Sequence, residues 1–120
     1  MVKIVFCLHR QDHLTHEEFD RYWREVHAPL VKRHADVLGI RRYVQLCQNE
    51  SGIGAALRAG RGAPEPYDGV AELWFDSAEV LGAAPSAEAR AAGRELLEDE
   101  RRFIDLDRSP IWLFDERAVI

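Results

Sequence analysis

A histidine lies on the flank of an apolar helical stripe in segment 24–34, which reads REVHAPLVKRH. At about 100° per residue, His27 projects close to Trp23 and Leu30. A half-buried imidazole that meets few charges tends toward its neutral form near pH 7, in which it can accept or donate a proton. Such a group can act as a general acid or base. A core histidine bonded to a backbone carbonyl has the same spacing, so this second interpretation stays open.

A proline and a second histidine follow in the same segment. Pro29 has no N–H, which leaves the carbonyl of Glu25 without its helical partner and predicts a bend just past His27. His34 lies near the same direction as His27, but about 10 Å further along the helix axis. Because this separation is too large for a shared metal ion, we expect no metal site here.

A tyrosine on the following strand is the second candidate for chemistry. Alternation places four side chains on one face of that strand: Arg41, Tyr43, Gln45 and Cys47. If helices cover this face, Tyr43 points toward His27 and can donate a hydrogen bond to a substrate oxygen. If they do not, it is an interface tyrosine at a subunit seam. The side chains that we expect to bind substrate beside this pair are Phe6, Trp23, Leu30, His34, Gln45 and Trp74, although aromatic residues at such spacings also occur as plain core.

Other polar groups carry no chemical signature. His9, His13 and His16 surround a loop without a neighbouring ligand at a metal-site spacing, so we interpret them as solvated. The charged run 98–102 (EDERR) is typical of a solvated helix face. The glycine-rich stretch 52–62 has neither the order of a dinucleotide-binding loop nor the lysine of a phosphate-binding loop.

The elements that must position these residues form a simple series. Periodicity predicts strands at 2–9, 40–48, 69–75 and 110–114, helices at 16–38 and 86–104, and a short helical turn at 77–84. Thr15 and Glu18 form a capping box at the start of the first helix, Gly39 ends it, and Ser86 caps the second. The order βαββαβ predicts an α+β fold with a four-stranded antiparallel sheet and both helices on one face.

Composition indicates one globular domain over residues 1–120. The chain is 47% hydrophobic and 31% charged, and its net charge of -5 argues against nucleic acid and anionic membrane surfaces. No apolar stretch can span a bilayer, and the N-terminus does not read as a signal peptide. Cys7 and Cys47 lack metal or disulfide spacing, so we expect free thiols in the cytoplasm. The segment 50–68 reads as a long loop, either a mobile lid or partly disordered, with a short helical turn at 55–58.

The sheet should have two apolar faces, of which helices can cover one. In the first strand Ile4 and Phe6 point one way and Val5 the other, and in the last strand Trp112 opposes Leu113. The uncovered face predicts a homodimer that packs sheet on sheet. The alternative is a monomer in which the long loop folds over this face.

Four short motifs are characteristic of one protein family: residues 8–10 (LHR), 14–19 (LTHEEF), 22–30 (YWREVHAPL) and 41–45 (RRYVQ). By these motifs the chain resembles the EthD-like family of dimeric α+β barrels. The resemblance implies a ferredoxin-like fold, two subunits joined through their sheets, and a pocket between sheet and helices in each. Similar proteins include a methylmuconolactone methylisomerase and cyclases or decarboxylases of aromatic polyketides, which work without a cofactor. Their pocket histidine and tyrosine correspond to His27 and Tyr43, and the loop 50–68 is longer than the family leads us to expect.

The leading hypothesis is therefore a cofactor-independent isomerase, cyclase or lyase of a small lactone or aromatic polyketide-type substrate. His27 would move a proton next to a carbonyl, and Tyr43 would stabilise the enolate oxygen. One alternative is a cofactor-independent oxidoreductase or monooxygenase of phenolic compounds. Another is a binding or accessory protein that holds a hydrophobic metabolite without converting it.

Overall fold

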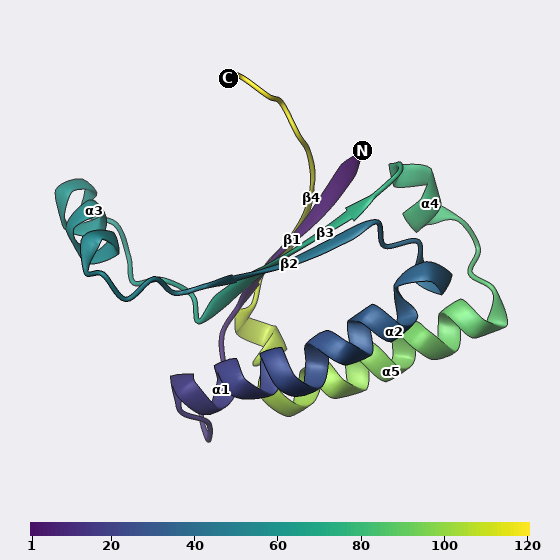
Figure 1. Cartoon of the computed structure of the whole chain (residues 1–120), viewed down its shortest axis with the longest axis horizontal. Helices are drawn as coiled ribbons and strands as arrows, with labels where there is room; N and C mark the ends of the chain where they lie inside the picture. Colours follow the sequence, from purple (N-terminus) through teal and green to yellow (C-terminus); the bar gives the residue numbers. More distant parts are fainter.

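The structure, a computed structural model, describes all 120 residues and shows an antiparallel sheet with its long helices on one face (Figure 1). In chain order the elements are β1 (Val2–Leu8), α1 (His16–Tyr22), η1 (Trp23–His27), α2 (Ala28–Leu38), β2 (Arg42–Cys47), α3 (Ile53–Arg61), β3 (Gly69–Phe75), α4 (Ala78–Gly82), α5 (Ala87–Phe103), η2 (Leu106–Arg108) and β4 (Ile111–Asp115). None of the helices has the length and apolar character needed to cross a membrane.

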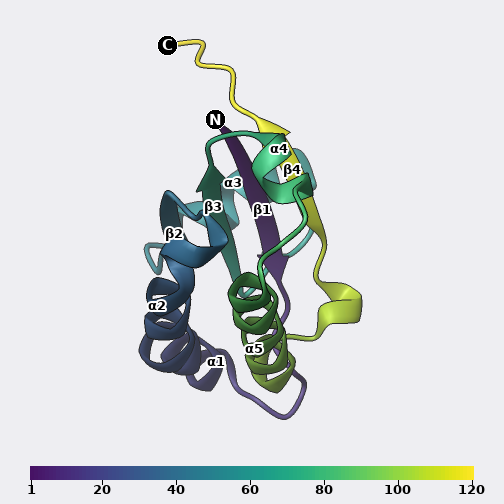
Figure 2. The ribbon, with the colours of Figure 1, turned by 90° about the vertical axis from the view of Figure 1, so that its right-hand side faces the viewer.

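The four strands pair in the order β2-β3-β1-β4, and every pair is antiparallel. The α1–α2 segment and α5 lie side by side under the sheet (Figure 2). This confirms the predicted α+β, ferredoxin-like arrangement, in which both helices of the split β-α-β pair cover one face. The predicted strand limits agree with the observed ones to within two residues.

The first helical segment begins and ends where local signals predict. The Thr15 hydroxyl accepts from the backbone N–H of Glu18, and the Glu18 carboxylate accepts from the N–H of Thr15. Gly39 closes the segment in the left-handed conformation, at φ 75°. A π-helical turn, η1, ends two residues before Pro29, which is in the first turn of α2. The predicted bend just past His27 stays a prediction.

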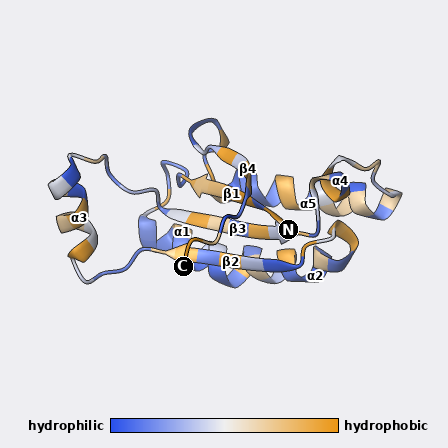
Figure 3. Cartoon of the chain, turned by 90° about the horizontal axis from the view of Figure 1, so that it is seen from above, coloured by the Kyte–Doolittle hydropathy of each residue, from blue (hydrophilic) through white to orange (hydrophobic).

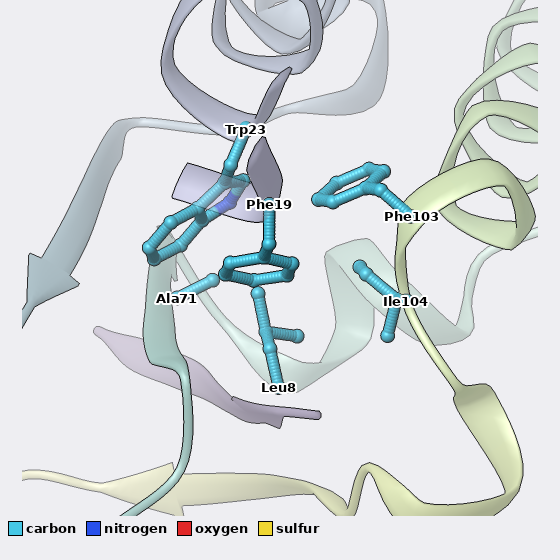
Figure 4. Packing of buried hydrophobic residues seen from close by; sticks show 6 residues of the cluster. All are labelled: Leu8, Phe19, Trp23, Ala71, Phe103 and Ile104. Atoms are coloured by element: carbon cyan, nitrogen blue, oxygen red, sulfur yellow. The ribbon is translucent and has the colours of Figure 1, made fainter. Parts of the chain in front are cut away.

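The core lies between the sheet and the helices in two clusters. The first contains the largest fully buried side chains, which meet around the end of β1 and the end of α5 (Figure 4): Leu8, Phe19, Trp23, Ala71, Phe103 and Ile104. Gly69 permits this packing, because a Cβ there would come within 2.4 Å of the Trp23 ring. The second cluster comprises Val2, Val31, Ile40, Phe75 and Leu96.

The face of the sheet away from the helices is uncovered and partly apolar (Figure 3). On β4, Trp112 and Phe114 are 49% and 47% exposed, and Leu46 on β2 is 45% exposed. The second apolar face expected from strand alternation is thus present. The homodimer that would cover it stays a prediction.

The segment 50–68 differs from the expected loop. It contains the helix α3, which stands at the end of an extension of β2 and β3, away from the other helices (Figure 1). The predicted turn at 55–58 lies inside this longer helix. The segment does not fold over the open face of the sheet, and a lid role stays a prediction.

Candidate functional site

His27 is buried at the end of the π-helical turn. Its side chain is 7% exposed, its Nδ1 lies 2.7 Å from Oδ2 of Asp99 on α5, and its ring packs against Phe103. A π turn adds one residue to the helical repeat, and such turns occur frequently at functional sites. Here the turn ends at the residue whose imidazole meets α5.

Asp99 is the buried carboxylate that orients this imidazole. Besides His27, it accepts hydrogen bonds from the Tyr22 hydroxyl and from Nη1 of Arg102. Burial alone would raise the pKa of Asp99, but the hydrogen bonds from these three groups outweigh it, so the pKa lies below its ordinary value. Asp99 is therefore an anion near neutral pH, and its partners must act as donors.

The state of His27 follows from this environment. Burial lowers the pKa of His27, and the bond to Asp99 offsets the decrease only in part. The imidazole is therefore neutral near pH 7, with its proton on Nδ1 facing the Asp99 carboxylate. Nε2 then carries a lone pair and has no protein partner. Every fully buried side-chain nitrogen and oxygen in the chain has a hydrogen-bond partner. Because Nε2 has none, it is not fully buried, and a ligand can contact it.

Tyr43 approaches the same space from the sheet. It pairs with Leu73 in the ladder and lies on the helix-covered face, which confirms the predicted orientation and argues against a position at a subunit seam. Its hydroxyl accepts a hydrogen bond from Nε2 of Gln45, 3.0 Å away, and Gln45 also donates to the carbonyl of Trp23. Burial raises the pKa of Tyr43, so the phenol keeps its proton and can donate it to a ligand oxygen.

Glu100 is a third polar side chain at this place. It follows Asp99 on α5 and has no hydrogen-bond partner in the chain. Burial raises the pKa of Glu100 to about 7, and the neighbouring Asp99 charge adds to the increase. This carboxyl group is thus divided between its neutral and charged forms near neutral pH.

His27, Tyr43 and Glu100 line one small cavity between the sheet and the helices. Its volume is about 60 Å³, and the rest of its wall is carbon: Phe6, Leu8, Trp23, Val31, Ala71, Leu73, Leu96 and Ile104. A substrate-sized pocket has about 300–1,000 Å³. A wider groove of about 550 Å³ between α2 and β2 shares Val31 and Tyr43 with the cavity. The cavity alone is therefore too small for a whole substrate of ordinary size, whereas the volume of the neighbouring groove is within that range.

Three of the residues expected to bind substrate lie at or next to this cavity. Phe6 and Trp23 form part of its wall. Gln45 does not line it, but holds the Tyr43 hydroxyl and the π-helical turn. These three residues and the pair His27 and Tyr43 are thus brought together as expected.

Two further expected residues lie elsewhere on the helical layer. Nε2 of His34 lies 2.8 Å from Oε2 of Glu95 at the surface between α2 and α5. Leu30 packs against the second core cluster. Neither residue lines the cavity that contains His27, so the structure does not place them with the pair His27 and Tyr43.

Trp74 lies on the opposite face of the sheet. Strand alternation separates it from its neighbour Leu73, which faces the helices. Lys3 and Arg42 lie over its ring at 4.8 and 4.7 Å, and its indole N–H donates to Glu116. The prediction that Trp74 lines the cavity is therefore wrong.

Sequence reasoning missed the acidic residues of the site. The prediction of a solvated face over residues 98–102 is wrong for two of them, because Asp99 is 2% exposed and Glu100 lines the cavity. The signal lay in helical spacing, because both residues come three and four positions after the buried Leu96 and three or four before the buried Phe103. This spacing places Asp99 and Glu100 on the same side of the helix as the buried apolar residues, although both are acidic.

The fold and the site define an α+β domain of the ferredoxin-like class, with an imidazole–carboxylate pair beside an apolar cavity between sheet and helices. A family model described as the EthD domain matches residues 11–107. The chain belongs to the EthD family. No curated protein matches it.

Solved structures with the same fold cover nearly the whole chain. An ethyl tert-butyl ether D (EthD) family protein from Bacillus halodurans is 19% identical, with a TM-score of 0.64 over 98% of this chain and 99% of that one. A dimeric protein of unknown function and ferredoxin-like fold from Bacteroides fragilis is 15% identical, with a TM-score of 0.58 over 96% and 95%. HapK from Hahella chejuensis is 12% identical, with a TM-score of 0.59 over 100% and 95%. At these identities the likeness establishes the fold alone.

Proposed function

We propose that this protein is a cofactor-independent isomerase, cyclase or lyase that moves a proton on a small lactone or aromatic polyketide-type substrate. The observation that carries this proposal is the neutral His27, held through Nδ1 by an ionised Asp99, at a carbon-lined cavity that also contains the Tyr43 hydroxyl. This combination supplies a base, a group that stabilises the protonated base, and a donor for a developing oxyanion.

The residues would act in the following order. Nε2 of His27 accepts a proton from the carbon next to a substrate carbonyl. The imidazolium that forms is stabilised by the Asp99 carboxylate, 2.7 Å from Nδ1. The electron pair left on carbon moves to the carbonyl oxygen, and Tyr43 donates a hydrogen bond to the resulting enolate. The carbon wall keeps water away and strengthens both interactions.

We further propose that the chain acts as a homodimer joined through the open face of the sheet. Support comes from the half-exposed Trp112 and Phe114 on that face and from the apolar residues around them. The Bacteroides fragilis protein of the same fold is described as dimeric. A second copy of the same face would cover these side chains, as expected for a self-complementary interface.

The test is a mass-resolved turnover screen. The protein, His27→Gln and Tyr43→Phe would be incubated with muconolactones, anthrones and phenolic keto acids, with and without oxygen. His13→Gln is the matched control, because this histidine is exposed in the loop before α1. We expect His27→Gln to reduce turnover by about a hundredfold or more and Tyr43→Phe by about tenfold to a hundredfold, while His13→Gln does not change it.

The product mass distinguishes the reaction types. An unchanged mass indicates an isomerase, and a loss of water or carbon dioxide indicates a cyclase or lyase. A product that requires oxygen would replace this proposal by the oxidoreductase alternative. Retention of one compound by all variants, without any product, would favour a binding protein, and unchanged turnover in His27→Gln would remove this residue from the mechanism.

A further inference from the structure

The cavity contains a carboxyl group to which the mechanism above assigns no task. Its wall has three polar side chains, and Glu100 is the only one of them without a protein partner that fixes its role. His27 is fixed by Asp99, and Tyr43 is fixed by Gln45. An unpaired carboxyl group is unusual in a carbon-lined cavity, because burial without a partner destabilises its charged form.

We propose that Glu100 is a second catalytic residue, which delivers a proton to one substrate atom after His27 has removed a proton from another. This inference rests on the proposed function and names the acid that the function otherwise lacks. It also restricts the substrate: the end that enters the cavity must be uncharged and must have two proton-exchanging positions in conjugation.

The groups that face Glu100 agree with this role. His27 from η1 and Tyr43 from β2 line the same cavity as Glu100, and the charge of Glu100 acts on the Tyr43 hydroxyl. On its own helix the nearby charges are Asp99 and Arg101, of which the first disfavours ionisation and the second favours it. The strands β1 and β3 and the helix α2 contribute only carbon side chains to this cavity.

The cavity wall contains no cationic side chain, and this indicates that the end of the ligand that enters the cavity carries no negative charge. A substrate carboxylate placed there would lie beside Glu100 and near Asp99 without a positive partner, so a charged end would be excluded. A neutral lactone, enone or ketone can enter. Its oxygen meets the Tyr43 hydroxyl, and its acidic carbon lies within the space shared by His27 and Glu100.

The step balances without any further reactant. A C–H bond breaks, its proton goes to Nε2 of His27, and its electron pair passes through the carbonyl into a conjugated enolate. The O–H bond of Glu100 then breaks, its proton forms a new C–H bond at the far conjugated carbon, and the electron pair of the enolate oxygen restores the carbonyl. The charges left on the imidazolium and on the Glu100 carboxylate are cancelled when a proton passes from His27 to Glu100, directly or through solvent.

The test separates removal of the first proton from delivery of the second. Wild type, Glu100→Gln, Glu100→Asp, His27→Gln and the control Glu98→Gln, an exposed residue on the same helix, would be compared in D₂O with a substrate identified by the screen. NMR would follow exchange of the substrate proton, and product formation would be measured in parallel over a range of pH. Thermal unfolding would verify that each variant is folded.

We expect Glu100→Gln to exchange the substrate proton at close to the wild-type rate while it forms product about a hundredfold more slowly. Glu100→Asp should restore part of the product formation, and Glu98→Gln should match wild type. In wild type, product formation should decrease above about pH 7 as Glu100 loses its proton, and this alkaline limb should be absent in Glu100→Gln.

Other outcomes overturn the proposal in distinguishable ways. Full product formation in Glu100→Gln would show that Glu100 is not the acid, while leaving the role of His27 intact. Equal loss of exchange and product formation in Glu100→Gln would assign the residue to folding or binding. No exchange in wild type would refute the proposed function itself, and the role of Glu100 with it.

Discussion

The half-buried Glu100 should make the free energy of unfolding depend on pH, and Glu100→Gln should remove this dependence. Its pKa is about 7 in the folded chain, against an ordinary value of 4.5. The folded state therefore binds this proton more tightly than the unfolded state does. The resulting stability is fully present below pH 4.5 and is lost as the pH rises to about 7.

The size of the effect follows from the two pKa values. Each pKa unit corresponds to about 1.4 kcal/mol, so the full contribution of Glu100 to the free energy of unfolding is about 3 kcal/mol. At pH 5 this carboxyl group is already partly ionised in the unfolded chain. We therefore expect the free energy of unfolding of Glu100→Gln to rise by about 2–3 kcal/mol relative to that of wild type between pH 5 and pH 8. For a domain of this size, this corresponds to about 10 °C in Tm.

The assay is urea unfolding of both proteins at pH 5, 6, 7 and 8, at one protein concentration, since association would also shift stability. Glutamine has nearly the same shape as glutamic acid and does not titrate, so other groups cancel in the difference. Glu98→Gln, on the exposed side of α5, should show no such change with pH. Parallel stability profiles for wild type and Glu100→Gln would refute the reasoning, because they would mean that Glu100 ionises in the folded chain as readily as in water.

Three further changes test the site, the core and the open face. Asp99→Asn should lower the free energy of unfolding by about 3 kcal/mol in urea and reduce turnover, because His27 and two other donors lose their anionic acceptor. Gly69→Ala should lower the free energy of unfolding by about 1–3 kcal/mol, because its Cβ would overlap a tryptophan ring, whereas Gly93→Ala, with open space around it on α5, should not. Trp112→Glu should shift sedimentation from dimer to monomer without loss of helical circular dichroism. A dimer of unchanged affinity would place the interface elsewhere.

Most of the fold could be predicted because its signals are local. The capping box at Thr15, the left-handed Gly39 and the cap at Ser86 set the helix limits by hydrogen bonds within a few residues. Strand β1 ends one residue earlier than expected, since the N–H of His9 bonds to the Ser109 hydroxyl instead of to a neighbouring strand. Local propensity failed for α3, which is helical although it contains two glycines, residues that disfavour helices.

The site was predictable only in part, for a physical reason. His27 and Tyr43 are apolar-face positions that also have reactive groups, and both periodicity and the family resemblance pointed to them. Asp99 and Glu100 occupy positions on the apolar side of α5 that helical spacing identifies equally well, but charged side chains are seldom buried, so their charge predicts exposure. Burial of Asp99 is favourable only because Tyr22 and His27, from another helical segment, donate hydrogen bonds to it. The sequence does not show that these segments are in contact.

The irregular turn before Pro29 connects the two catalytic candidates. In η1 the N–H of Ala28 bonds to the carbonyl of Trp23, five residues back, and the same carbonyl accepts a hydrogen bond from Gln45. The second hydrogen of that amide goes to the Tyr43 hydroxyl. One glutamine side chain thus ties the helical turn that carries His27 to the strand that carries Tyr43. The proposed base and the proposed oxyanion donor are therefore placed by one structural feature. The π turn positions His27, and its Trp23 carbonyl holds Gln45, which in turn holds the Tyr43 hydroxyl.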